Sequence, residues 1–274
     1  MPRYTIKKLY TDTYSIADGG FGQGKVYMYL LVGSEKALLV DSGYGLLDLR
    51  AITSAVTEKP VVCVCTHGHI DHALGARQFD EAYLHSGDFD VYRQHTDPAF
   101  ITNAAMNGLL IRPPRYMLGN PGYKKSVEEM AGKDYPPLLA LDDRGRFELG
   151  GRTLSWRLVP GHTQGSIVVV DEEHATVFDT DAAAPGAWLF LPESSPLPEY
   201  RAELERYRAF LRERDIKRRY VGHAGKAFRE GHIGKLIRCA EIAEAKPRKG
   251  IRVNSPLGDA RIVFAGGSLL FCGR

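Results

Sequence analysis

Four side chains that can bind a divalent metal stand close together in the segment His67-Gly-His69-Ile-Asp71-His72. Neutral imidazole and carboxylate are the ligand types that zinc takes in proteins. The apolar run 61–65 directly before them predicts a buried strand, and residues 73–79 have helical spacing. A strand-to-helix loop lets side chains converge above a rigid sheet. The segment therefore predicts a metal site, with solvated loop histidines as the alternative.

Other candidate ligands stand just after the ends of further predicted strands. These residues are His162, Asp181, His223 and Asp41. Strand ends that meet at one sheet edge are where an α/β protein builds its site. The remaining four histidines lack such a context, and we expect them to be surface or capping residues: His85, His95, His174 and His232.

The hydrophobic pattern predicts an α/β fold. Apolar runs predict strands at 26–32, 37–40, 61–65, 82–85, 167–170 and 175–178, with two more in 147–159 and two in 262–272. Helical spacing predicts helices at 46–56, 73–79, 199–214 and 226–246. The strand–helix–strand step from 37 to 65 is typical of a layered α/β protein.

Residues 86–140, the lid segment, differ from the rest of the chain. They are rich in Tyr, Pro, Gly and Asn, with short helix candidates near 86–95, 99–110 and 124–131. A long irregular segment in a compact domain favours a lid over the active site, and a packing insertion is the alternative. Since no linker or repeat divides the chain, we expect one domain over 1–274, ending in C-terminal strands at 250–274.

Composition narrows the function classes. The 274 residues carry a net charge of +3, which indicates neither a nucleic-acid nor a membrane partner. We therefore expect a small-molecule substrate, and a homo-oligomer is possible because the lid segment or the C-terminal strands could form an interface. Cys63 and Cys65 share one strand face, which favours core packing over zinc thiolates. An N-terminus without a signal-peptide core favours a reducing cytoplasm.

Taken together, these motifs resemble the metallo-β-lactamase superfamily over residues 26 to 225. The resemblance implies a four-layer αββα sandwich with two metal ions at one edge of the sheets. By residue matching, the first ion would be held by three histidines and the second by Asp71 and two histidines, with Asp181 bridging both. The first set is His67, His69 and His162, and the second is Asp71, His72 and His223. The turn at Asp41 also matches, and Asp41 would orient a ligand histidine.

Two features of the match refine the resemblance. An Asp at the bridging position is similar to the glyoxalase II and lactonase branch, whereas true β-lactamases usually have Cys there. Thr180 stands where the superfamily usually has Gly, and Asp179 is an alternative bridge. Asp181 is favoured because three alanines follow it.

The resemblance implies a binuclear metal-dependent hydrolase of a small ester, lactone or thioester. Two divalent ions, zinc or else iron or manganese, would share a bridging hydroxide. Asp71 would act as the catalytic residue that accepts or relays the proton. Three alternatives stay open: a phosphodiesterase or nuclease with the same metal pair, a mononuclear iron sulfur dioxygenase, and a non-catalytic metal-binding protein.

Overall fold

The larger of the two central sheets carries the predicted metal loop. The computed structural model describes residues 4–19, 25–107, 121–255 and 258–273. Within them, this sheet has seven strands whose spatial order follows the chain: β1 (Tyr4–Tyr10), β2 (Thr13–Asp18), β3 (Val26–Val32), β4 (Ala37–Val40), β5 (Val61–Cys65), β6 (Ala82–His85) and β7 (Leu139–Leu141). Strands β1 to β4 are antiparallel and β4 to β7 are parallel. The strands predicted at 26–32, 37–40, 61–65 and 82–85 are confirmed.

Helices in the parallel crossovers cover the outer face of this sheet. They are α1 (Leu49–Ser54), α2 (Ile70–Ala73) and the 3₁₀ helix η1 (Leu74–Gln78). Asp48 starts α1, because its side chain accepts a hydrogen bond from the Ala51 N–H. The helices predicted at 46–56 and 73–79 are thus present with shifted ends, and the second is a short α-helix followed by a 3₁₀ turn.

The second sheet has six strands in the order β14-β13-β11-β10-β9-β8. Their bounds are β8 (Arg144–Glu148), β9 (Thr153–Leu158), β10 (Ile167–Asp171), β11 (Thr176–Phe178), β13 (Arg218–Val221) and β14 (Ala224–Phe228). The parallel step from β11 to β13 contains α7 (Leu197–Glu213). A smaller sheet joins β12 (Gly186–Leu189) to the C-terminal strands β17 (Ser268–Cys272), β16 (Gly258–Ala265) and β15 (Ile251–Ser255). The strands predicted at the C-terminus are confirmed, whereas β12 and its pairing with β17 were not predicted.

Central strands are apolar on both faces because each sheet is covered on both sides. In β5, Val62 and Val64 belong to the core between the two large sheets. Cys63 and Cys65 point the other way, into the core beneath the crossover helices. Both cysteines are buried and free. The expected core packing of these cysteines is confirmed.

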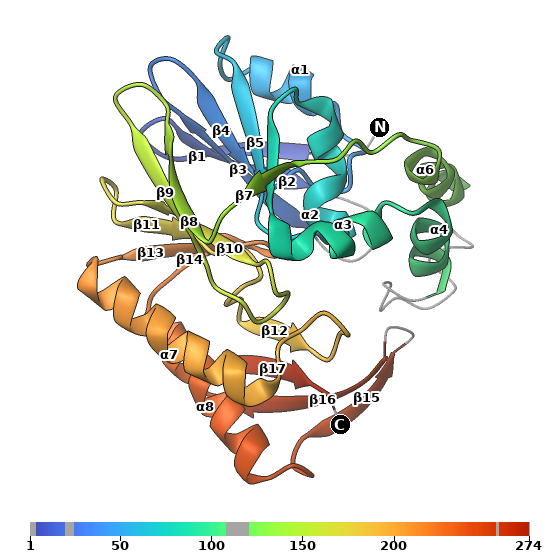
Figure 1. Cartoon of the computed structure of the whole chain (residues 1–274), viewed down its shortest axis with the longest axis vertical. Coiled ribbons are helices and arrows are strands. Elements are labelled where there is room, and N and C mark those ends of the chain that lie inside the picture. Colours follow the sequence, from blue (N-terminus) through green and yellow to red (C-terminus); the bar gives the residue numbers. More distant parts are fainter. Residues whose placement is uncertain (1–3, 20–24, 108–120, 256–257, 274) are drawn as a thin grey trace.

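The layers follow the order helix, sheet, sheet, helix, and the predicted αββα sandwich is confirmed (Figure 1). The outer face of the second sheet packs against α7 and α8 (Gly231–Ala245). Leu204, Tyr207 and Leu211 of α7 are each at most 1% exposed. Burying one such side chain contributes about 2 kcal/mol. The small third sheet then covers α8 through Val263 and Leu270.

The described part of the lid segment is largely helical. It contains η2 (Ser86–Asp88), α3 (Phe89–His95), α4 (Pro98–Asn107) and α6 (Pro121–Ala131), and residues 108–120 lie outside the described residues. In Figure 1, α4 and α6 stand at one side of the first sheet. The last residues expected in this segment, 139–140, instead belong to edge strand β7. The role of the lid segment as a cover over the site stays a prediction.

One predicted helix begins in the wrong place. The sequence predicts a helix from 226, but β14 continues to Phe228 and α8 starts at Gly231. The reason is tertiary pairing: Arg219 of β13 pairs with Phe228, and Val221 pairs with Ala224 around the turn that carries His223. Within the described ranges, no helix combines the length and the apolar composition needed to cross a membrane.

Candidate metal centre

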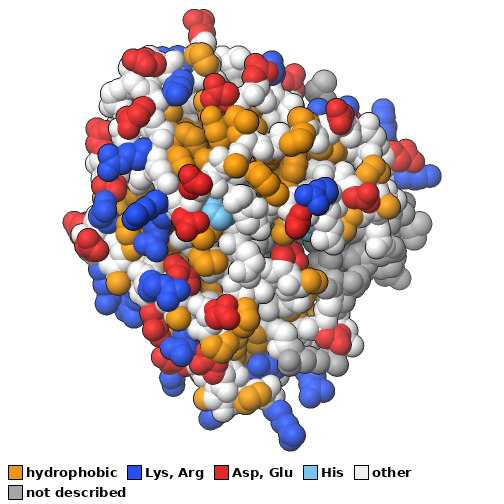
Figure 2. Space-filling model, in the orientation of Figure 1, with side chains coloured by type: hydrophobic (Ala, Val, Ile, Leu, Met, Phe, Trp, Pro, Cys, Tyr) orange, Lys and Arg blue, Asp and Glu red, His pale blue; other side chains and the backbone are white. Residues whose placement is uncertain are grey.

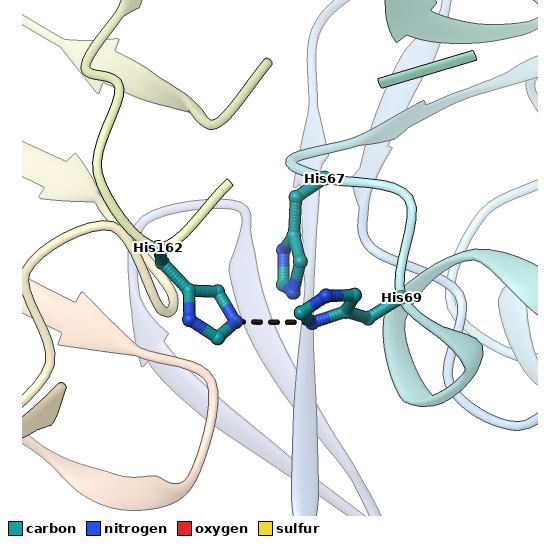
Figure 3. Close-up of side chains that lie close together, drawn as sticks. All are labelled: His67, His69 and His162. Atoms are coloured by element: carbon teal, nitrogen blue, oxygen red, sulfur yellow. Dashed lines mark hydrogen bonds between the residues drawn. The ribbon is translucent and has the colours of Figure 1, made fainter. Parts of the chain in front are cut away.

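Three histidines from two strand ends meet between the sheets, and we name them the first cluster: His67, His69 and His162. His67 and His69 follow β5, and His162 follows β9. Nε2 of His162 lies 3.0 Å from Nδ1 of His69, and ring centroids of the three residues are 4.6–4.9 Å apart (Figure 3). All three are at most 6% exposed. Their ring nitrogens therefore face one small volume.

A second cluster lies beside the first and consists of Asp71, His72 and His223. Oδ2 of Asp71 is 3.6 Å from Nε2 of His72 and 3.4 Å from Nε2 of His223. Gly222 leaves room for the carboxylate of Asp181 beside this cluster, because a Cβ at position 222 would stand 2.6 Å from Oδ1 of Asp181. The turn before His223 therefore needs glycine for space.

Asp181 lies between the two clusters. Its Oδ2 is 3.2 Å from Nε2 of His223, 3.7 Å from Nε2 of His72 and 3.9 Å from Nε2 of His162. The structure thus brings together all seven residues that the sequence selected as metal ligands. Asp181 therefore lies within 4 Å of histidines from both clusters.

The alternative bridge, Asp179, faces away from the clusters. It is fully buried and forms an ion pair with Arg219, and it accepts a hydrogen bond from the Tyr207 hydroxyl at 3.1 Å. Nε of Arg219 donates to the same carboxylate at 2.7 Å. A carboxylate already paired with a buried guanidinium is a poor ligand for a second cation, because breaking a buried ion pair is costly. The geometry favours Asp181.

Several buried polar atoms at the site fit a cation. Among the described residues, Nε2 of His67, Nε2 of His72 and Oδ1 of Asp181 have no hydrogen-bond partner. An unsatisfied buried acceptor costs about 1–3 kcal/mol, so such atoms ordinarily have a partner. Ligand atoms of His67, His72 and Asp181 lie within 4.8 Å of one another, and coordination of a divalent metal would satisfy them. The residues present therefore fit the metal ions that the fold implies.

Electrostatics differ between the clusters. Burial lowers the pKa of His67 well below its ordinary value, and burial with His69 nearby lowers the pKa of His162 to about 4. These rings are therefore neutral, which is the form that binds a metal. In the second cluster burial also opposes the charge, yet nearby carboxylates raise the pKa of His72 to about 10 and that of His223 to about 9. A metal cation would displace those protons.

The ring nitrogens that face away from the site have partners of their own. Nδ1 of His72 lies 2.7 Å from Oδ2 of Asp41, and Nδ1 of His162 lies 3.0 Å from the Trp188 carbonyl oxygen. Such contacts fix the tautomer and the orientation of an imidazole ligand. Asp41 thus occupies the place expected of a residue that orients a histidine.

Asp41 is itself held by an unusual backbone and a small polar network. Its φ is +61°, and Oδ1 accepts hydrogen bonds from the Thr66 N–H at 2.7 Å and the Thr66 hydroxyl at 2.8 Å. The Thr66 hydroxyl is also 2.6 Å from that of Thr180. Thr180 has a φ of +29°, a conformation that favours glycine, so its hydroxyl contact accompanies a strained backbone.

Three residues of this region were not selected from the sequence. Asp88 is fully buried and accepts hydrogen bonds from Gly68 N–H at 2.8 Å, the Thr163 hydroxyl at 2.7 Å and Gly165 N–H at 2.7 Å. It thereby joins the two loops that carry the first cluster. Asp88 lies just after β6, so the strand-end rule that found the other residues could have found it.

The other two residues lie against His69. Oε1 of Glu193 is 2.7 Å from Nε2 of His69, and the His95 ring stacks on His69 at 4.7 Å. His95 was expected to be a surface or capping residue. The expectation of a surface position is wrong, because His95 is only 6% exposed. Its Nδ1 does accept a hydrogen bond from the backbone N–H of Ile70 at 3.1 Å. Burial opposes the charge of Glu193, yet its hydrogen bond with His69 lowers its pKa to about 2.

Comparison with known proteins identifies the family. A family model described as the metallo-beta-lactamase superfamily matches residues 21–223, a range that contains both clusters. The chain belongs to this superfamily. Members of the superfamily depend on metal, in agreement with the residue types that converge here.

Individual members of the superfamily are distant in sequence. Acyl-coenzyme A thioesterase MBLAC2 of Bos taurus is 24% identical in an alignment 260 residues long that covers 88% of this chain and 90% of that protein. The protein of the same name from Homo sapiens is also 24% identical over the same shares. A solved metallo-beta-lactamase from Pontibacter korlensis superimposes with a TM-score of 0.60 at 17% identity, covering 87% of this chain and 99% of that one. At that identity the structure supports the fold alone.

Proposed function

We propose that this member of the superfamily is a binuclear metal-dependent hydrolase of a small acyl substrate, with thioesters as the first candidate. The proposal is supported by the convergence of seven side chains that could bind a metal into two clusters, with Asp181 near both. A site for one ion would not need the second group of Asp71, His72 and His223.

In this proposal the first cluster would hold one ion and the second cluster another, and Asp181, which is near both clusters, would contribute a ligand to each ion. Bound divalent ions, most simply zinc with iron or manganese as alternatives, would lower the pKa of a shared water and polarise the acyl carbonyl group. Asp71 is 16% exposed at its side chain and borders this space, so it can take up the proton released when water attacks.

Other residues act on the geometry of the site. Asp41 and the Trp188 carbonyl keep His72 and His162 in fixed orientations. Burial of the first cluster keeps water from screening these contacts. Solvent and substrate can reach the site at His223, whose side chain is 40% exposed.

The substrate class is inferred from the relatives. The curated proteins that align with 88% of this chain are named acyl-coenzyme A thioesterases. A thioester is also within the acyl substrates that a water nucleophile and a polarised carbonyl can serve. On the face shown in Figure 2, Lys and Arg side chains are interspersed with Asp and Glu, a pattern that gives no support to a nucleic-acid substrate.

A panel of substrates on protein of measured zinc, iron and manganese content tests the proposal. The panel contains acyl-coenzyme A thioesters, lactones, carboxylic esters, phosphodiesters and β-lactams. We expect hydrolysis of a thioester, lactone or ester that is lost in His67→Ala. Hydrolysis of phosphodiesters alone, or acyl hydrolysis that survives complete metal removal, would overturn it.

A further inference from the structure

Glu193 contacts the first cluster from the loop between β12 and α7. Its Oε1 lies 2.7 Å from Nε2 of His69, and the two side chains are 17% and 8% exposed. A carboxylate only accepts hydrogen bonds, so Nε2 of His69 carries the proton in this contact. In a neutral imidazole the lone pair then lies on Nδ1, the atom that faces His162 at 3.0 Å.

The loop that carries Glu193 is fastened to the loop that carries His162. The Ser194 hydroxyl donates to the His162 carbonyl at 2.9 Å, and the Ser195 N–H donates to the Gly161 carbonyl at 2.8 Å. Gln164 Nε2 donates to the Ser195 hydroxyl at 3.1 Å. Glu193 therefore reaches His69 from a support that also holds His162, so one loop relates two members of the cluster.

A second constraint on the His69 ring comes from His95 of the lid segment. The His95 ring stacks on the His69 ring with an interplanar angle of 19°. Stacking limits the tilt of the ring but does not choose between its two nitrogens. The hydrogen bond with Glu193 makes that choice, because a carboxylate oxygen can only accept it.

We propose that Glu193 is a positioning residue for the first metal ion: it holds His69 in the tautomer whose Nδ1 lone pair is directed at the ion. The inference rests on the proposed metal centre. A carboxylate partner also makes the ligand nitrogen more basic, and loss of such a partner typically weakens metal binding about 10–100-fold.

Zinc affinity of metal-stripped protein, measured by competition with a chromophoric chelator, tests this role. In Glu193→Ala we expect the tighter site to bind about 10–100-fold more weakly. Glu193→Gln should lose less, because its amide oxygen can still accept the bond from His69. Glu199→Ala is the matched control, since it removes the same charge from an exposed position in the first turn of α7. Its affinity should stay within about twofold, because Glu199 contacts neither cluster.

A proton NMR signal gives a readout that a merely structural role would not move. The zinc-loaded protein should show a downfield imidazole proton, assigned to Nε2 of His69 by its loss in His69→Ala. We expect this signal to disappear in Glu193→Ala and to remain in Glu199→Ala. An unchanged signal together with unchanged affinity in Glu193→Ala would overturn the proposal. If that variant does not fold, Glu193→Leu, which also has no acceptor for Nε2–H of His69, replaces it: unchanged zinc affinity overturns the proposal and a loss supports it.

Zinc binding by the parent and by His67→Ala separates an error in the role of Glu193 from an error in the proposed metal centre. If the parent protein binds no zinc, or if His67→Ala binds as much zinc as the parent, the metal centre itself is wrong. If the parent binds zinc and His67→Ala binds less, then unchanged binding in Glu193→Ala rejects only the role of Glu193.

Discussion

The two clusters differ in how completely the protein encloses them. Every member of the first cluster is at most 6% exposed, and the loops around it are joined by Asp88 and by Glu193. In the second cluster His72 is fully buried against Asp41, but the His223 side chain is 40% exposed. An enclosed site is preorganised, whereas an open one leaves room for substrate. We therefore expect the first ion to bind more tightly and the second to exchange more readily.

The largest effect is expected from removing a buried ligand. His67→Ala should lose the first ion. Its kcat/KM should fall by a factor of about 10³ or more, equivalent to roughly 4 kcal/mol of transition-state stabilisation. His223→Ala should retain one ion per chain after dialysis, because the first cluster is intact. Metal analysis and steady-state kinetics on both variants provide the check. Retention of an ion by His67→Ala but not by His223→Ala would mean that the second cluster, and not the first, is the tighter site.

The next effect concerns the support of the second cluster. Asp41→Asn replaces an acceptor that serves both Thr66 and His72, leaving buried donors without a charged partner. We expect about 3 kcal/mol lower free energy of unfolding, measured in urea on metal-free protein. Asp48→Asn, at the exposed start of α1, is the control and should cost no more than about 1 kcal/mol. Equal losses in the two variants would show that the Asp41 network contributes little.

Support of the first cluster can be weakened through Asp88. In Asp88→Asn the amide nitrogen would face one of the N–H or O–H donors that now bind the carboxylate. We expect a loss of about 2 kcal/mol in stability together with weaker binding of the tighter zinc ion. Asp90→Asn, which only loosens an exposed contact with Arg93, should change stability by less than about 0.5 kcal/mol. Parent-like zinc affinity in Asp88→Asn would separate this residue from the metal centre.

The smallest effect is expected at Thr180. Thr180→Gly removes a strained positive φ and also removes the hydroxyl contact with Thr66. The two terms oppose each other, so the free energy of unfolding should change by less than about 1 kcal/mol. Urea unfolding of the metal-free variant measures the balance. A loss above about 3 kcal/mol would mean that the hydroxyl network outweighs the strain by far.

Most of the site was readable from the sequence because its ligands stand directly after strands. His162 and Asp181 follow β9 and β11, which end at the same edge of the second sheet. Their approach to His67 on the first sheet was predicted from the family resemblance. Asp88 follows the same rule and was overlooked because it lies in the irregular lid segment.

Glu193 and His95 depend on longer-range structure. Glu193 follows β12, a short strand that pairs with the C-terminal strand β17 and has no local signal of its own. His95 ends α3, and its approach to His69 is set by how that helix packs. The αββα layers followed from strand and helix periodicity together with the family resemblance, whereas the third sheet required pairing between distant segments.

The action of two ions on an acyl substrate can be measured by restoring metal to stripped protein. Rates of acyl-coenzyme A thioester hydrolysis are recorded while zinc is added back, with bound ions per chain counted at each point. Activity should require zinc and should rise most steeply as the second ion binds. Full activity in stripped protein, or a rate that is already maximal at one ion per chain, would contradict the action of two ions.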